Sequence, residues 1–246
     1  MKTIDLNSDL GEGLPTDEQI IPLVSSANIA CGYHAGDADT MKRTIEQCMM
    51  HGVVVGAHPS WPDRENFGRT EMQKSSAEIY NIITEQLSII AAIAKELGTN
   101  LHHVKPHGAL YNQSAKDNTI AHAIAKAVYD FDTSLLLVGL SGSRSLTEAA
   151  ALGLLTVHEV FADRTYQDDG SLTARSQPNA LIEDEATALQ QVLQMIHEQT
   201  VTTVSGKIIP VKADSICIHG DGKKAVAFAS TISSALQQDH IEVKAN

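Results

Sequence analysis

Short apolar stretches alternate with helical stretches along most of the chain. Seven runs are rich in apolar and β-branched residues, and some of them are continuously apolar, as in 53–55 and 135–138. Continuous rather than alternating hydrophobicity is typical of parallel strands that are covered on both faces. The runs are Thr3–Asp9, Ala27–Cys31, Val53–His58, His102–His107, Leu135–Leu140, Thr156–Phe161 and Ser215–His219. They predict seven parallel strands.

Helical periodicity fills the segments between these runs. Over 76–97 apolar side chains recur at steps of three and four, between the capping-box sequence 75–78 and Gly98. Apolar spacing from Met41 to Met49 predicts a second helix, which Gly52 closes. Further helices are expected near 115–130, 144–152, 181–198 and 223–237.

Repeated strand–helix alternation implies right-handed crossovers and a parallel sheet. The sequence has no Pro/Ser-rich linker and no low-complexity segment, so we expect a single domain over residues 1–246. That length is close to the roughly 250 residues of an α/β barrel. The predicted fold class is therefore α/β, and a closed barrel of seven or eight strands is favoured over an open doubly wound sheet.

The charge and the cysteines exclude several classes of protein. Eighteen Lys and Arg against 30 Asp and Glu give a net charge of −12, which argues against nucleic acid and anionic membrane surfaces as partners. The apolar runs are shorter than the ~20 residues that span a bilayer. Cys31, Cys48 and Cys217 are too few and too far apart for a disulfide framework. The first five residues do not resemble a signal peptide. We expect a soluble cytoplasmic protein.

Chemically active side chains gather where six of the predicted strands end. In a parallel barrel these ends meet at one rim, where such barrels place their active sites. The chain has eleven histidines, and four of them fall at the predicted rim. The rim residues are Asn7, Asp9, Glu12, His34, His58, Asp63, Arg69, Lys105, His107, Glu159, Asp163, Arg164 and His219.

Each of these residues also has an ordinary structural interpretation. A histidine after a strand is about as often a hydrogen-bonded loop residue as a functional one. Lys105 could bind an anion or complete a salt bridge, and Asp163 with Arg164 could form an internal ion pair. Asn7 and Asp9 share one strand face, where they could orient a ligand or satisfy buried loops.

A divalent metal is one hypothesis for this rim. Asp9, His34 and His58 would come from three adjacent strands, and one carboxylate with two imidazoles suits Zn, Fe, Ni or Mn. Such a site would lower the pKa of a bound water. No pair of histidines four residues apart on one helix adds support.

The common nucleotide-binding and serine-hydrolase motifs are missing from the sequence. It has no Gly-x-x-x-x-Gly-Lys-Ser/Thr loop, no Gly-x-Gly-x-x-Gly after a strand, and no Gly-x-Ser-x-Gly elbow. The segment 220–223 is only a weak imitation of a phosphate loop. Any use of ATP therefore requires another kind of site or a partner protein.

The strand-end motifs resemble the LamB/YcsF family over residues 3 to about 222. The resemblance implies a seven-stranded parallel (β/α)7 barrel that is polysaccharide-deacetylase-like. Tyr33 and Thr165 stand where Phe and Gly are expected. The motifs are DLNSDLGE (5–12), SANIACGYHAGD (26–37), GAHPS (56–60), FGR (67–69), VKPHGALYN (104–112), EVFADR (159–164), DGSL (169–172) with Arg175, and HGDG (219–222).

The resemblance also implies an activity, a co-substrate and partners. The family's reaction converts 5-oxo-L-proline, ATP and water to L-glutamate, ADP and phosphate. It requires two further 5-oxoprolinase subunits, B and C, and we expect ATP to be used on those subunits. On this basis Asp9, Glu12, Lys105, His107 and His219 are the expected catalytic residues. The expected substrate-binding residues are Asn7, Asn28, Arg69, Asp163 and Arg164.

Two other functions stay open from the sequence. One is a stand-alone metal-dependent carbohydrate N-deacetylase, which would release acetate without ATP. The other is a non-catalytic subunit that only binds or delivers the substrate. The sequence also leaves open whether the chain forms a homo-oligomer.

Overall fold

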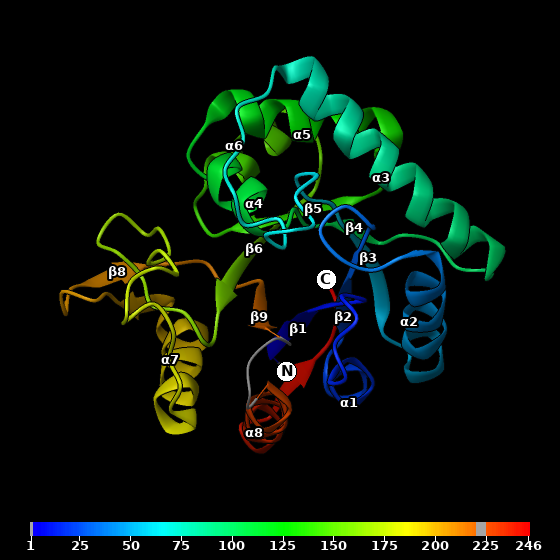
Figure 1. Ribbon diagram of the computed structural model, residues 1–246. Coiled ribbons are helices and arrows are strands. Elements are labelled where there is room, and N and C mark those ends of the chain that lie inside the picture. Colours follow the sequence, from blue (N-terminus) through cyan, green and yellow to red (C-terminus); the bar gives the residue numbers. More distant parts are fainter. Residues whose placement is uncertain (1, 220–224) are drawn as a thin grey trace.

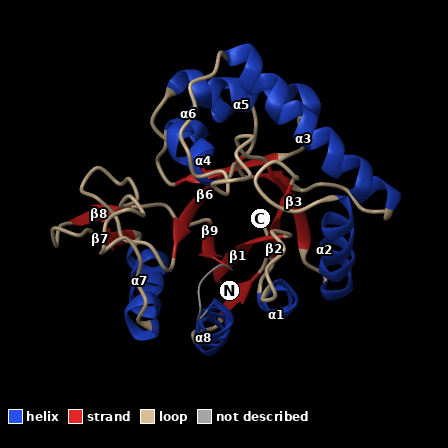
Figure 2. Ribbon diagram, in the orientation of Figure 1, coloured by secondary structure: helices blue, strands red, loops and turns tan. Residues whose placement is uncertain are grey.

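Seven parallel strands form a closed barrel in the computed structural model, which describes residues 2–219 and 225–246 (Figure 1). They pair in chain order, and β1 closes the ring against β9. Figure 2 shows this ring of strands with helices outside it. The predicted seven-stranded barrel is therefore confirmed. The strands are β1 (Lys2–Leu10), β2 (Ser26–Ala30), β3 (Val54–His58), β4 (His103–Val104), β5 (Leu136–Leu140), β6 (Thr156–Phe161) and β9 (Ser215–His219).

The two faces of β1 have different surroundings. Asp5, Asn7 and Asp9 are buried polar residues inside the barrel, whereas Leu6 and Leu10 belong to the apolar core beneath the helices. This separation follows from the two-residue period of a strand. In the closing pair, Asn7 lies opposite Cys217 and Asp9 lies opposite His219. The register therefore places polar residues of the first and last barrel strands next to each other at the carboxyl ends of these strands.

The helices follow the sequence signals closely. The Ser75–Glu78 capping box begins α3, the Asp37 side chain caps α2, and Gly52 ends α2 with a left-handed backbone. The helix expected near 115–130 is confirmed as α5, which the Asp117 side chain caps, whereas the short helix α4 that precedes it was not predicted. The helices are α1 (Asp17–Ile20), η1 (Ile21–Leu23), α2 (Ala38–His51), α3 (Ser76–Glu96), α4 (Gly108–Ser114), α5 (Asn118–Phe131), α6 (Arg144–Leu152), α7 (Glu185–Glu198) and α8 (Ala225–Gln238).

Three short strands were not predicted. β7 (Thr200–Thr202) and β8 (Ile208–Pro210) form an antiparallel hairpin, which Figure 1 shows beside α7 and away from the barrel. β10 (Ile241–Val243) pairs with the start of β1. Three residues are too few to show a two-residue hydrophobic period, so these strands carry no signal in the sequence. None of the helices in the described part of the chain is long and apolar enough to cross a membrane.

Candidate active site

A cleft of about 370 Å³ opens at the carboxyl ends of the barrel strands. Its position agrees with the rule that ligands bind at this end of a parallel barrel. The structure places eight of the expected site residues around it and puts Asn7, Asn28, His34 and Asp163 beneath or beside it. The eight are Asp9, Glu12, His58, Arg69, Lys105, His107, Arg164 and His219.

Lys105 lies at the floor of the cleft between two carboxylates. Its side chain is 2% exposed, and Nζ lies 2.9 Å from Asp9 Oδ1 and 2.7 Å from Glu159 Oε1. Burial alone would lower the pKa of Lys105, but Asp9, Cys217 and Glu159 raise it well above its usual value. Lys105 is therefore a fixed positive charge rather than a proton donor. The aromatic rings of Tyr111 and Phe161 lie beside it, with centroids 6.0 and 5.6 Å from Nζ.

Two buried asparagines support this ion pair from below. Asn28 Nδ2 donates to Asn7 Oδ1 at 2.8 Å and to Asp9 Oδ1 at 2.9 Å. Asn7 Nδ2 donates to Glu159 Oε1 at 3.0 Å and to Ser215 Oγ at 2.7 Å. Both side chains are buried and neither lines the cleft. The structure thus places Asn7 and Asn28 where they position Asp9 and Glu159 rather than where a ligand would contact them.

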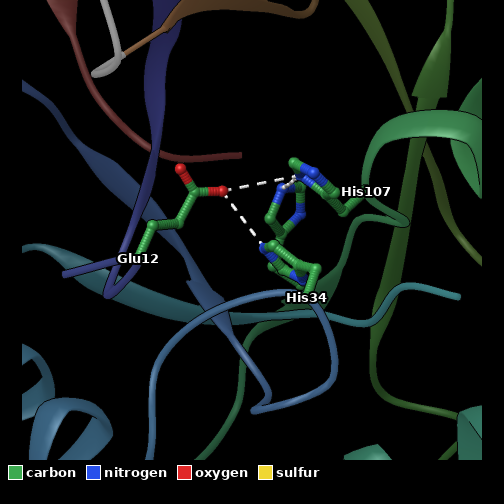
Figure 3. A group of neighbouring side chains, drawn as sticks. Glu12, His34 and His107 are labelled. Atoms are coloured by element: carbon green, nitrogen blue, oxygen red, sulfur yellow. Dashed lines mark hydrogen bonds and ion pairs between the residues drawn. The ribbon is translucent and has the colours of Figure 1, made fainter. Parts of the chain in front are cut away.

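Glu12 and three histidines converge at one side of the cleft. Figure 3 shows the Glu12 carboxylate directed at the rings of His34 and His107. Glu12 Oε1 lies 3.2 Å from His34 Nε2 and 3.6 Å from His107 Nδ1. The rings of His34 and His107 are stacked with centroids 3.8 Å apart. One ligand atom from each of Glu12, His34, His58 and His107 lies within 4.8 Å of the others.

Main-chain carbonyl groups fix how two of these rings are protonated. His58 Nδ1 lies 2.7 Å from the carbonyl oxygen of Lys105, and His107 Nε2 lies 2.9 Å from that of Phe67. A carbonyl only accepts, so these outer nitrogens carry the hydrogens and donate. In neutral rings, His58 Nε2 and His107 Nδ1 then present lone pairs toward each other. Burial, reinforced by His58, holds the pKa of His107 well below its usual value and lowers that of His34 to about 3.

This group fits a divalent cation. Neutral imidazole nitrogens and a carboxylate oxygen that converge are the ligands Zn, Fe, Ni and Mn take, and ligand histidines commonly donate their other N–H to a carbonyl. The group contains His34 and His58 from the predicted ligand set, together with Glu12 and His107. Asp9, the third predicted ligand, is outside the group, although its Oδ2 lies 3.2 Å from His58 Nε2. Asp9 joins a second possible group with Cys217 and His219.

Asp163 holds the ring of His219. Both Asp163 oxygens lie 2.9 Å from His219 Nδ1, and the ring stacks on Phe161. Burial would raise the pKa of Asp163, but the neighbouring His219 lowers it. This carboxylate accepts the Nδ1 hydrogen and leaves Nε2 for chemistry in the cleft that His219 lines. Asp163 does not line the cleft, so the structure places it as a positioning group for His219.

The two predicted arginines differ in their surroundings. Arg164 is 4% exposed, and it donates from Nε to the carbonyl oxygen of Ala180 and from Nη2 to that of Thr173. These bonds tie together the long segment between β6 and α7. The Asp163 carboxylate pairs with His219. Arg164 also attracts this carboxylate, but less strongly than His219 does. The guanidinium of Arg69 lies 5.0 Å from the centroid of Phe67.

Sequence reasoning missed several residues of the site. Glu159 stands at a predicted strand end without an expected role, and Tyr111, Lys116 and Arg175 also line or support the cleft. His103, whose Nε2 lies 2.8 Å from Asn28 Oδ1, is absent from the expected set. One signal was present for Glu159, because a lone acid inside the apolar run 156–161 is the kind of residue that needs a buried cation. The segment 220–223, which imitates a phosphate loop weakly, lies outside the described residues.

Comparison with known proteins shows close relatives along the whole chain. The model of the LamB/YcsF family matches residues 4–246. A Tolumonas auensis protein that is named as one of the subunits of 5-oxoprolinase is 52% identical over 250 aligned positions, which cover all of both chains. The crystal structure of the lactam utilization protein from Thermus thermophilus superposes with a TM-score of 0.94 at 42% identity and also covers both chains fully.

More distant structures share the fold. The family 4 carbohydrate esterase from Streptomyces lividans, solved in complex with acetate, matches with a TM-score of 0.55 at 13% identity. The match covers 98% of this chain and 91% of the esterase chain. The peptidoglycan deacetylase PdaC from Bacillus subtilis matches at 14% identity with a TM-score of 0.51, over 99% of this chain and 87% of that one. The expected likeness to the polysaccharide-deacetylase barrel is confirmed at the level of the fold.

Proposed function

Because the chain belongs to the LamB/YcsF family, we propose that it opens the ring of 5-oxo-L-proline by hydrolysis to give L-glutamate. The reaction is coupled to the conversion of ATP to ADP and phosphate, and it is shared with two partner subunits, B and C. The names of the Thermus and Tolumonas relatives, a lactam utilization protein and a 5-oxoprolinase subunit, support this proposal. The observation that carries it is the buried Asp9–Lys105 pair at the floor of a cleft ringed by histidines.

The chemistry of the substrate explains why ATP is needed. A five-membered lactam keeps its amide resonance and has little ring strain, so water attacks its carbonyl carbon slowly. Transfer of the γ-phosphoryl group of ATP to the lactam oxygen forms an O–P bond, breaks the bond between the γ-phosphorus and ADP, and makes the ring carbon electrophilic while ADP leaves. The sequence has no phosphate loop, so we assign this transfer to the partner subunits and the later attack of water to this chain.

The cleft offers the groups that the attack of water requires. Asp9 acts as the general base that takes a proton from water, or Glu12 does so when it does not hold a metal. The positive charge of Lys105 stabilises negative charge that develops at the cleft floor, because a charge fixed in a buried site needs no reorganisation. His219, oriented by Asp163, protonates the leaving ring nitrogen, so that the ring opens to an acyl phosphate. A second water then cleaves the acyl–oxygen–phosphorus link and releases glutamate and phosphate.

A divalent metal fits this scheme as a cofactor. Glu12, His34, His58 and His107 would hold it, and it would supply Lewis acidity to water or to the substrate oxygen. Residues of the chain itself orient the ligand histidines of this site. Lys105 and Phe67 accept hydrogen bonds through their main-chain carbonyl groups, and these bonds aim the lone pairs of His58 and His107 inward.

Reconstitution with the two partner subunits tests the proposal. We expect glutamate and phosphate to form in equal amounts from 5-oxoproline and ATP only when all three chains are present. Full activity of this chain alone would refute the division of labour. Folded Asp9→Ala and His58→Ala variants should lose activity, and normal rates from both would refute the site assignment.

The same assays separate the two other candidate functions. Release of acetate from N-acetylated sugars without ATP would identify a carbohydrate N-deacetylase, and the shared barrel fold by itself does not favour that activity. Binding of 5-oxoproline that survives Asp9→Ala and His219→Ala, without any turnover in the complex, would identify a non-catalytic subunit.

A further inference from the structure

The charge of the cleft is opposite to the charge of the chain. The protein carries 18 basic and 30 acidic residues, but five basic and three acidic side chains line the cleft. Lys105 is one of the five, and Asp9 and Glu159 neutralise it. The other four basic side chains line the cleft together with two further acids, Glu12 and Glu71, so the lining still has more positive than negative side chains. A cleft of one sign in a protein of the other sign concentrates ligands of opposite charge.

Three of these basic side chains come from the segments that follow α4 and β6. Lys116 follows α4, and Arg164 and Arg175 belong to the segment between β6 and α7. Ser171 and Ser176, from the same segment, add hydroxyl groups to the lining. The acid and histidine groups come instead from the ends of β1, β3, β4 and β9. The cleft is thus lined both by the catalytic groups at the strand ends and by Lys116, Arg164 and Arg175, which we call the basic wall.

Arg164 gives the basic wall a rigid centre. Its side chain is almost fully buried, and two of its nitrogens already donate to the main-chain carbonyl groups of Thr173 and Ala180. These bonds hold the guanidinium plane in one orientation against the cleft. Burial and the nearby charge of Arg175 lower the pKa of Arg164 to about 10. Two like charges beside each other in a partly buried wall repel. Asp163 offsets part of this repulsion, and an anion bound between the two arginines would offset more of it.

We propose that Lys116, Arg164 and Arg175 form a subsite for a phosphoryl group. The subsite deepens the proposed function and rests on it, because its ligand is the phosphoryl group of a lactam that has been activated elsewhere. A tetrahedral oxyanion can accept hydrogen bonds from two guanidinium groups and an ammonium group at once, which a planar carboxylate does less fully. Binding there places the activated ring carbon toward Asp9, Glu12 and the histidines.

Calorimetric titration with inorganic phosphate, at constant ionic strength, tests the subsite on the isolated full chain. We expect phosphate to bind more tightly than acetate, and the double variant Lys116→Gln/Arg175→Gln to weaken phosphate binding by about tenfold or more. Arg43→Gln, an exposed arginine on α2 away from the cleft, is the matched control and should bind phosphate as the wild type does. Arg164 is left intact because it ties down its own segment.

Two results would overturn the subsite. One is phosphate binding that is absent or is unchanged in the double variant, and the other is acetate binding as tightly as phosphate with the same sensitivity to the two substitutions. The titration uses neither lactam nor partner subunits. If the chain binds phosphate through these residues but forms no glutamate with its partners, the subsite is supported and the proposed function is refuted. If glutamate forms but the chain binds no phosphate, the proposed function is supported and the subsite is refuted.

Discussion

The inner ring nitrogens of His58 and His107, Nε2 and Nδ1, lie 2.9 Å apart, while the outer nitrogen of each ring donates to a main-chain carbonyl. Two neutral imidazoles in this arrangement direct lone pairs at each other, which is unfavourable unless a cation or an additional proton lies between them. Burial lowers the pKa of His107 and so disfavours the additional proton on that ring. The arrangement favours a metal ion.

Protein purified without chelators should therefore contain one divalent ion, or bind one on addition of Zn²⁺ or Mn²⁺. Loss of a direct ligand should cost more than the 10- to 100-fold in affinity that is typical of an outer partner, so we expect His58→Ala and His107→Ala each to weaken binding by at least ~100-fold. The exposed His122→Ala variant is the control. The prediction would be contradicted if the purified protein contains no metal and if neither added Zn²⁺ nor added Mn²⁺ changes its melting temperature or its activity.

Lys105→Met should destabilise the protein by about 3–5 kcal/mol, because Asp9 and Glu159 would be left buried without their cation. Urea unfolding followed by circular dichroism measures the change. Lys126→Met removes an exposed lysine that pairs with Asp130, and it should cost less than about 1 kcal/mol. Equal stabilities of the two variants would show that the buried pair contributes no more than a surface pair.

Asp163→Asn should lower kcat in the reconstituted reaction by roughly 100-fold with a smaller change in KM, because the amide no longer fixes the His219 ring for proton transfer. Asp132→Asn, at an exposed turn, is the control. If KM alone rises, then Asp163 contacts substrate and does not position His219.

Gly56→Ala should be strongly destabilising, because a Cβ at this position would overlap the imidazole ring of His103 inside the barrel. The φ angle of Gly56 needs no glycine, so the clash is the cause. The double variant Gly56→Ala/His103→Ala should recover part of the lost stability, and thermal unfolding of the four proteins in this cycle measures the coupling. Strictly additive effects would show that the two residues do not clash.

Asp17→Asn should stabilise the protein at pH 8 but not at pH 4. Burial raises the pKa of Asp17 to about 6, so the folded state holds this proton more tightly than the unfolded chain does. The charged carboxylate therefore costs stability above about pH 6, and the cost disappears as the pH falls below about 4. An asparagine keeps an acceptor for the Gly11 N–H, and the expected gain at pH 8 is on the order of 2 kcal/mol.

Urea unfolding at the two pH values measures this gain. Glu65→Gln, in an exposed loop, should change stability by less than about 0.5 kcal/mol at both. A gain from Asp17→Asn that is the same at pH 4 and pH 8 would show that the charge is not its source.

The sequence was sufficient for the architecture, because the signals for it are local. Continuous apolar runs indicate buried parallel strands, and caps such as Ser75 and Asp37 mark where helices begin. All seven barrel strands were found this way, and their polar ends identified the rim that became the cleft. The resemblance to the LamB/YcsF family, carried by the same strand ends, is confirmed by the match over residues 4–246.

Only the tertiary structure decided which of the rim residues meet. The sequence could not show that Glu12 rather than Asp9 joins the histidine group, or that Lys105 lies between Asp9 and Glu159, because these contacts join strands far apart in the chain. Strand order sets which ends are neighbours, but the register across each pair and the direction of each side chain set which atoms touch. A shift of one residue in the β1–β9 register would turn Asp9 and Asn7 out of the barrel, and the site would not form.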